Sequence, residues 1–324
     1  MLSVHLEAGQ VSLKSIAKPR RPRGHALLRL LTGGICNTDL ELQRGYYGFS
    51  GTPGHEFVAE VVNSDDDPTW VGKRVVGEIN LACHKCDWCK RGLGRHCPTR
   101  TVLGIVKYPG AFREYFTLPL ENLLEVPAKV STRHAVFTEP LAAACEILEQ
   151  IKIPRGTPVA VLGDGKLGLL IAQTLAVHGA RVHQFGRHKD KLAIAEKAGV
   201  TGEVTTGALP TCAYDIVVDA TGSPQGLTAA VAMTRPRGTL ILKSTVAGTV
   251  SIDTAPIIVN ELTLIGSRCG RFKPALDLLR KGKIHLDEMI HSEMPLSSAP
   301  EAFALAASRG VLKVLLTQPG HFDY

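Results

Sequence analysis

The stretch that decides the fold is residues 158–178, PVAVLGDGKLGLLIAQTLAVH, in which a short apolar run leads through a glycine-rich turn into a longer apolar run. The first run, Pro158–Leu162, predicts a buried strand, and Leu167–His178 predicts a helix. The turn between them, residues 163–168, has the pattern G-x-G-x-x-G. Because the chain contains 32 glycines, the pattern alone is a weak indication, so its place between a strand and a helix carries the weight.

In this setting, the turn predicts a dinucleotide-binding loop. The glycines permit a tight turn, a close approach of the pyrophosphate and close packing of the helix. The helix N-terminus adds free N–H groups and the positive end of its dipole. A tight strand-to-helix turn without a ligand is the alternative. The residues expected to contact the cofactor here are Gly163, Gly165, Lys166, Leu167 and Gly168.

The end of the next expected strand, Arg181–Phe185, is where such a domain reads the adenosine ribose, usually through an Asp or Glu. Here Gly186, Arg187 and His188 follow, and no carboxylate stands at the tip of the strand. The planar fork of an arginine suits a 2′-phosphate better than a free hydroxyl. The sequence therefore predicts that NADP is preferred over NAD, with a solvated basic helix start as the alternative.

Alternation of strands and helices continues after this stretch and predicts a doubly wound parallel sheet of the α/β class. Before Val126, in contrast, short alternating strands with Gly and Pro turns predict a β-rich domain. Between the two, Ser131 is expected to cap a helix. The other expected elements include strands at 5–16, 215–220, 239–242, 262–266 and 312–317, and helices at 189–198, 225–233, 273–281 and 300–308.

Composition narrows the function classes. The chain has 324 residues, 44% apolar and 21% charged, as in a globular protein of two domains. Lys and Arg exceed Asp and Glu by 37 − 30 = 7, but the basic residues are scattered and do not demand a nucleic acid. Neither a secretory signal nor a long apolar span stands out. We therefore expect a cytoplasmic protein without a nucleic-acid or membrane partner.

Four of the eight cysteines share one short window with the spacing C-x2-C-x2-C-x7-C. In a cytoplasmic protein, clustered cysteines are metal ligands or redox groups rather than disulfides. Four thiolates suit tetrahedral zinc, while an iron–sulfur cluster and unmetallated thiols are the alternatives. A site with four protein ligands has no open position, so its predicted role is structural. The four residues are Cys83, Cys86, Cys89 and Cys97.

A second group of reactive residues lies at the ends of expected strands. Cys36 follows the strand Leu27–Leu31, and His55 and Glu56 immediately precede the strand Phe57–Val62. Scaffolds place reactive groups at such element ends. A buried thiol is the alternative interpretation of Cys36.

The order of these motifs resembles the zinc-dependent medium-chain dehydrogenase/reductase family over nearly the whole chain. The motifs that carry the resemblance are, in order, Cys36, Gly54-His55-Glu56, the four-cysteine window, Glu139-Pro140-Leu141 and the loop 163–168.

The resemblance implies an architecture and a set of partners. A GroES-like catalytic domain would be formed by residues 1–140 and 271–324, and a Rossmann domain by residues 141–270. The implied partners are a small alcohol or carbonyl substrate and further copies of the chain in a homodimer or homotetramer. The implied cofactors are the nicotinamide dinucleotide and two zinc ions per chain, one catalytic and one structural.

By the same resemblance, Cys36 and His55 correspond to ligands of the catalytic zinc, and Glu56 or Glu139 to its carboxylate. Three protein ligands leave a fourth position for an alcohol oxygen, which zinc activates as a Lewis acid for hydride transfer to nicotinamide. Thr38 corresponds to the hydroxyl that takes the substrate proton. By the resemblance, Glu41 stands where many alcohol dehydrogenases have a histidine that passes the proton outward, and some sugar dehydrogenases of the family share this glutamate. This favours a polyol or sugar substrate. Glu41 is either a proton exit or a solvated charge.

Two other functions are weighed against this one. A non-zinc quinone or enone reductase of the same fold would have no use for the metal-ligand set. A zinc-stapled nucleic-acid-binding module would leave the glycine loop, His55 and Glu139 without a role. Both alternatives account for fewer of the motifs than an alcohol dehydrogenase does.

Overall fold

The computed structural model describes residues 1–244 and 249–318, which divide into two compact units. The first unit contains Met1–Glu139 and the described residues from Ile290 onward, and the second contains Pro140–Met289. The second boundary thus differs from the expected one, because residues 271–289 belong to the second unit. They are tied to it through His285, whose N–H donates to Gln173 Oε1 at 2.7 Å and whose carbonyl accepts from Gln173 Nε2 at 3.2 Å.

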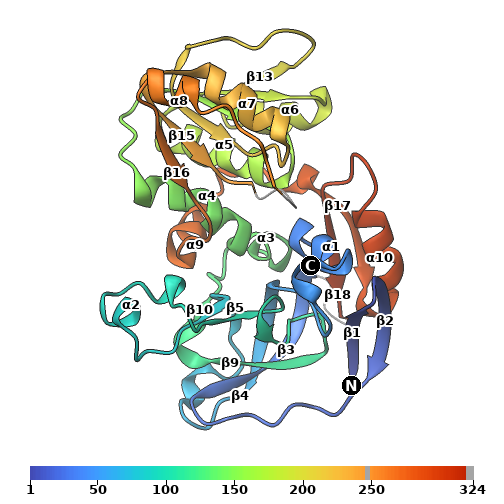
Figure 1. The fold of residues 1–324 in the computed structure, drawn as a ribbon. Helices are drawn as coiled ribbons and strands as arrows, with labels where there is room; N and C mark the ends of the chain where they lie inside the picture. Colours follow the sequence, from blue (N-terminus) through green and yellow to red (C-terminus); the bar gives the residue numbers. More distant parts are fainter. Residues whose placement is uncertain (245–248, 319–324) are drawn as a thin grey trace. The chain divides into compact units, whose positions relative to one another are not determined.

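The first unit is built on a seven-stranded sheet with the order β10-β5-β4-β3-β18-β17, and β9 also pairs with β3. Strand β18 comes from the end of the chain and pairs antiparallel with β3, so red and blue segments lie side by side in Figure 1. The strands are β3 His25–Gly34, β4 Glu56–Asn63, β5 Arg74–Gly77, β9 Tyr115–Pro119, β10 Leu123–Glu125, β17 Ile290–Pro295 and β18 Lys313–Thr317.

Smaller elements complete this unit. The single strand expected at residues 5–16 is a hairpin of β1 and β2, because Ala8 and Gly9 take positive φ angles of 49° and 81° and reverse the chain. The remaining strands are β1 Leu2–Glu7, β2 Gln10–Ser15, β6 Asn80–Leu81, β7 Thr101–Leu103 and β8 Lys107–Tyr108. The helices are α1 Asn37–Gln43, α2 Asp87–Lys90, α3 Thr132–Ala135 and α10 Ala299–Ala306, with 3-10 turns η1 Tyr46–Gly48, η2 Pro68–Trp70, η3 Gly94–His96, η4 Leu120–Asn122 and η6 Leu296–Ser298.

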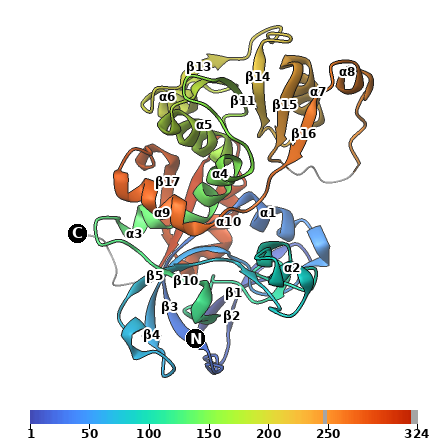
Figure 2. The same ribbon diagram turned by 90° about the vertical axis from the view of Figure 1, so that its left-hand side faces the viewer.

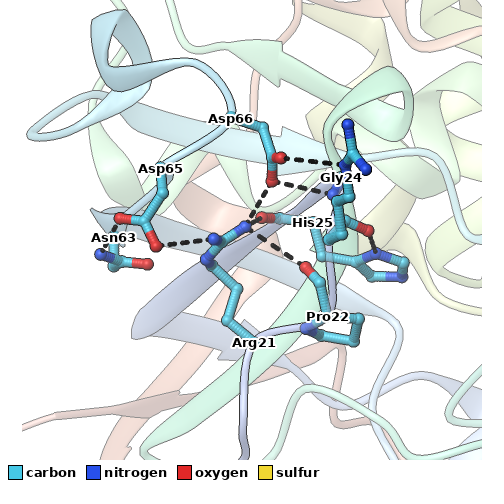
Figure 3. Close-up of polar contacts among 8 residues, drawn as sticks. Arg21, Pro22, Gly24, His25, Asn63, Asp65 and Asp66 are labelled. Carbon is cyan, nitrogen blue, oxygen red and sulfur yellow. Dashed lines mark hydrogen bonds and ion pairs between the residues drawn. The ribbon is translucent and has the colours of Figure 1, made fainter.

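The segment before β3 is anchored by Arg21. Its Nη1 donates to Asp66 Oδ2 at 2.6 Å and its Nη2 to Asp65 Oδ2 at 2.7 Å (Figure 3). Asp66 also accepts from the Gly24 N–H at 2.8 Å. These contacts tie the chain just before β3 to the turn that follows β4.

The second unit confirms the predicted doubly wound sheet. Its six strands are all parallel, in the order β13-β12-β11-β14-β15-β16. The chain order reverses between β11 and β14, and the glycine loop follows β11 at this switch point, where such sheets bind ligands. The strands are β11 Pro158–Leu162, β12 Arg181–Gly186, β13 Thr201–Val204, β14 Tyr214–Asp219, β15 Thr234–Leu242 and β16 Thr263–Gly266.

Helices cover this sheet. Helices α5 and α6 pack against each other beside β12 and β13, whereas α7 packs on β14 and β15 (Figure 2). A buried cluster of the sheet and α7 includes Phe185, Val217, Met233 and Leu240. The helices are α4 Thr138–Gln150, α5 Lys166–His178, α6 Lys189–Glu196, α7 Pro224–Met233, α8 Ala255–Val259 and α9 Phe272–Lys281, followed by η5 Asp287–Met289.

The helix expected after Ser131 is interrupted. Ser131 is its N-cap, since Oγ accepts from the His134 N–H at 3.2 Å. The chain nevertheless forms two helices, α3 and α4, because Pro140 has no N–H to continue the hydrogen-bond ladder across residues 136 and 137. Within the described residues, none of the helices has the length and apolar character needed to cross a membrane.

Candidate functional site

Cys36, His55 and Glu56 are brought together at one end of the paired strands β3 and β4. One ligand atom from each lies within 4.8 Å of the others. Gly34 and Glu56 are direct partners in the antiparallel register, and Cys36 follows β3 by two residues while His55 directly precedes β4. A Cβ atom at Gly34 would lie 2.7 Å from Glu56 Oε2, so this glycine leaves room for the carboxylate.

Asp39 holds Cys36 and His55 of this group through its side-chain carboxylate. Its side chain is fully buried, Oδ2 accepts from the Cys36 N–H at 2.9 Å, and Oδ1 accepts from the Gly54 N–H at 3.0 Å. Oδ1 also lies 3.5 Å from His55 Nδ1. A carboxylate behind a histidine fixes the orientation of the ring. The sequence prediction missed Asp39, although an acidic residue three positions after a helix N-cap, here Cys36, is a recognisable signal.

Lys313, on β18, forms a buried ion pair with Glu56. Both side chains are 1% exposed, and Lys313 Nζ donates to Glu56 Oε2. The sequence prediction missed this residue too. Its signal was a lone lysine at the start of the otherwise apolar run Lys313–Leu316, because a buried lysine requires a partner.

The electrostatics of the group suit a cation. The pKa of His55 lies well above its ordinary value: burial alone lowers it, but the charge of Asp39 and the contacts with Asp39 and Cys36 outweigh burial. His55 Nδ1 faces Asp39 at 3.5 Å, which leaves Nε2 as the ring atom available to a metal ion, and the buried Glu56 Oε1 has no hydrogen-bond partner in the described part of the chain. The negative charge of Asp39 and an unpartnered carboxylate oxygen suit a cation.

Three further predicted residues lie at different distances from this group. Thr38 is adjacent, with Oγ1 3.7 Å from Cys36 Sγ. Glu41 is on α1 but pairs with Arg44, Oε1 to Nη1 at 2.6 Å, in a partly exposed position. Glu139 is half-buried in the first turn of α4 and stands outside the three-residue group that the described residues form.

The four-cysteine window folds into a second candidate metal site. The Sγ atom of Cys86 lies 3.5 Å from that of Cys89 and 3.8 Å from that of Cys97. The Sγ atoms of Cys83 and Cys89 are 3.9 Å apart. Tetrahedral zinc with bonds of about 2.3 Å requires sulfur separations of about 3.8 Å. The pKa of Cys83 falls to about 5, because the Thr99 hydroxyl and nearby backbone N–H groups stabilise its thiolate.

The glycines of the loop after β11 have three different spatial roles. Gly163 has a φ of +112°, and a Cβ there would lie 2.6 Å from the Ala220 carbonyl oxygen. A Cβ at Gly168 would lie 2.2 Å from the Gly163 oxygen, whereas one at Gly165 would meet nothing within 4 Å. These are the requirements of a tight turn, of close helix packing and of free approach by a pyrophosphate. Lys166 and Leu167 are the first two residues of α5 and follow directly after Gly165.

At the tip of β12, the structure corrects the expectation that no carboxylate is present. Asp164, from the glycine loop, accepts from the Arg187 and His188 N–H groups at 2.7 Å each, and its Oδ2 lies 2.9 Å from His188 Nδ1. The Arg187 side chain is exposed and His188 is half-buried. The sequence analysis considered only the residues of the strand itself and not the loop that faces them.

Comparison with known proteins agrees with the fold. The alcohol dehydrogenase GroES-like domain matches residues 22–128, and the zinc-binding dehydrogenase domain matches residues 167–281. An erythritol/L-threitol dehydrogenase from Mycolicibacterium smegmatis is 31% identical, with 91% of each chain covered.

Two solved structures share the whole fold. A protein from Sinorhizobium meliloti assigned as a zinc-binding dehydrogenase, bound to NADP, has a TM-score of 0.90 and 28% identity over 98% of both chains. An alcohol dehydrogenase from Escherichia coli CFT073, complexed with NADH, has a TM-score of 0.89 and 25% identity over 98% of this chain and 99% of its own. The chain therefore belongs to the zinc-dependent medium-chain dehydrogenase/reductase family and is an alcohol oxidoreductase that works with zinc and a nicotinamide cofactor.

Proposed function

We propose that this enzyme interconverts a polyol or sugar alcohol and its carbonyl form, with Cys36, His55 and Glu56 holding a catalytic zinc ion. The observation that carries the proposal is the group itself, a half-buried thiol with a buried imidazole and a buried carboxylate within 4.8 Å, in which Glu56 Oε1 has no hydrogen-bond partner among the described residues. Three protein ligands of this chemistry leave one coordination position for a substrate oxygen.

The charges around the group support a divalent ion. In the metal-bound state, with Cys36 a thiolate and His55 neutral, Cys36, Asp39 and Glu56 would carry three negative charges against the single positive charge of Lys313. That excess of two negative charges would be costly unless it is paired. A divalent cation makes the group neutral while His55 stays an uncharged ligand.

Each residue has a task in the proposed reaction. Zinc held by Cys36, His55 and Glu56 would supply a Lewis acid for the alcohol oxygen, and a nicotinamide cofactor would supply the hydride acceptor. Asp39 holds the His55 ring in place and anchors the Cys36 backbone. Thr38, beside Cys36, takes the proton that leaves the substrate hydroxyl, and Glu41 passes it towards solvent.

The proposed carboxylate ligand is Glu56 rather than Glu139. Glu56 has its Oε2 on Lys313 and its buried Oε1 without a partner, next to the other two ligands. Glu139 stays the alternative ligand, through a side-chain movement or a bridging water. Substitution of each residue by Gln, followed by measurement of bound zinc, separates the two assignments.

A polyol substrate is supported by the relative that acts on erythritol and L-threitol, as its name states. It is also consistent with Glu41, which stands where many alcohol dehydrogenases have a histidine. Tyr46 and Tyr47, in η1 close after α1, are 37% and 68% exposed, so their rings are available to a ligand rather than buried in a core.

The finer properties of the proposed enzyme follow the sequence predictions. Zinc would bind twice per chain, at Cys36, His55 and Glu56 and at the four cysteines. NADP is proposed over NAD, because one charge-assisted contact from Arg187 to a 2′-phosphate is worth about tenfold or more. A cytoplasmic homodimer or homotetramer is the proposed form.

The test is a substrate screen with zinc-loaded protein. Simple alcohols, tetritols, pentitols, hexitols and sugars are incubated with NAD or NADP, and the absorbance of reduced nicotinamide is followed. We expect a higher kcat/KM for a polyol than for simple alcohols, and for NADP than for NAD. Reduction of quinones or enones without any alcohol oxidation would contradict the proposal, as would salt-dependent DNA binding without turnover.

A further inference from the structure

Asp164 occupies the place at which the cofactor's adenosine would be read. It is the second residue of the glycine loop, is 8% exposed, and reaches the turn between β12 and α6. One oxygen, Oδ2, accepts from both backbone N–H groups of Arg187 and His188 and contacts the His188 ring. The other oxygen, Oδ1, accepts no hydrogen bond from the described residues.

Gly186 and Asp164 fit together sterically. A Cβ atom at Gly186 would lie 2.6 Å from the Asp164 Cβ and 2.7 Å from its Oδ2. The space left by the glycine at the strand tip is therefore filled by a carboxylate from the facing loop. The tip carries an acid after all, although that acid belongs to a different element.

This carboxylate is ionised at neutral pH. Burial alone raises the pKa of Asp164, but the hydrogen bonds from the His188 backbone and ring and from the Arg187 N–H outweigh burial, so the pKa lies below the ordinary value. Paired backbone N–H groups at a turn are donors that suit an anion. Here an internal anion already holds both of them.

We propose that Asp164 is a specificity-determining residue for the cofactor: its carboxylate holds the N–H groups of Arg187 and His188, and its charge opposes a 2′-phosphate drawn to the Arg187 side chain. The inference rests on the proposed use of a nicotinamide dinucleotide. Arg187 thus favours NADP while Asp164 limits that preference, because like charges placed close together weaken binding. An ionised carboxylate also accepts hydrogen bonds from free ribose hydroxyls, which keeps NAD competitive.

The test compares adenosine 2′,5′-bisphosphate with 5′-AMP, which differ only in the 2′-phosphate, by calorimetry on the full-length protein. Asp164→Asn keeps the size and an acceptor oxygen but removes the charge. We expect it to tighten binding of the bisphosphate about tenfold and to leave 5′-AMP within about threefold. The ratio of kcat/KM for NADP to that for NAD rises in parallel.

A matched control is Asp190→Asn. Asp190 is exposed in the first turn of α6 and does not contact the strand tip. Its substitution by Asn removes the same charge as Asp164→Asn does. We expect less than a twofold change in the two-ligand ratio. Adding Arg187→Ala to Asp164→Asn should abolish most of the gain, because the gain is that of an unopposed arginine.

If Asp164→Asn unfolds, Asp164→Gly removes the same charge and in addition frees the N–H groups of Arg187 and His188, so it must show at least the same shift. An unchanged ratio in the folded variant, or an equal shift in Asp190→Asn, overturns the role of Asp164 while the cofactor assignment stands. Failure of the unmodified protein to bind either nucleotide, NAD or NADP overturns both the inference and the proposed cofactor use.

Discussion

The two candidate metal sites of the first unit solve the same coordination problem in different ways. The four-cysteine site draws every ligand from one loop, Cys83–Cys97, and all four ligand atoms are sulfur. The Cys36–His55–Glu56 group joins the ends of two strands with three different ligand chemistries. The first set is complete by itself, whereas the second has only three protein ligands.

Their surroundings differ in the same sense. Cys83, Cys86 and Cys89 are half-buried in a surface loop, whereas His55 and Glu56 are buried and rest on Asp39 and on Lys313. A closed site needs only its ligands, but an open site needs charged support to hold an incomplete ligand set in one geometry. The comparison therefore predicts that changes at the first site affect stability and changes at the second affect turnover.

The largest expected effect is on turnover. Replacing His55 with Ala removes one of three ligands, so kcat should fall at least a thousandfold because a Lewis acid supplies several kcal/mol to the reaction. Cofactor binding and far-UV circular dichroism should stay close to those of the unmodified protein. Bound zinc should fall by about one equivalent. Turnover unchanged after dialysis into metal-free buffer would refute the open site.

The converse change is Cys89→Ser in the closed site. We expect a large fall in Tm and loss of about one zinc equivalent, because the binding energy of a structural zinc is folding energy. The zinc at the open site and the KM of the remaining folded enzyme should be little affected. If the variant retains all its zinc, or keeps its Tm, the site is not structural zinc.

A third change tests the support of the open site. Lys313→Met leaves Glu56 buried without its partner, which should cost about 3–5 kcal/mol in the free energy of unfolding. The matched control is Lys197→Met, which breaks the partly exposed pair with Glu288 and should cost less than about 1 kcal/mol. Urea unfolding of both variants measures the difference. Equal values would show that Lys313 does not stabilise the group.

The smallest effect is expected at the edge of the open site. Glu41 is paired with Arg44 in a partly exposed position, so water can replace it as a proton exit. Glu41→Gln should lower kcat by less than about tenfold, with no change in bound zinc, whereas Thr38→Val should lower it by about a hundredfold or more. A larger loss in Glu41→Gln than in Thr38→Val would reverse the assigned order of the proton path.

The difference between ligands from one loop and ligands from separate strands also explains which sites could be predicted from the sequence. The four cysteines could be assigned from spacing, because ligands a few residues apart converge through local turns alone. The glycine loop could be assigned for the same reason, as its strand, turn and helix are contiguous. The boundary at residue 290 could not, because it depends on which unit α9 and His285 pack against.

Sequence by itself determined the parallel doubly wound sheet, the β-rich first unit, the glycine loop and the four-cysteine window, since hydrophobic periodicity and turn chemistry act over short stretches of chain. The set of Cys36, His55 and Glu56 was indicated by the resemblance to the family, and the register of β3 and β4 brings these residues together. Tertiary structure alone decided the partners of these residues. Glu56 meets Lys313 across 257 residues, and Asp164 meets the β12 tip only because β11 and β12 are neighbours in the sheet. Such pairings depend on strand order and register, which no local pattern encodes.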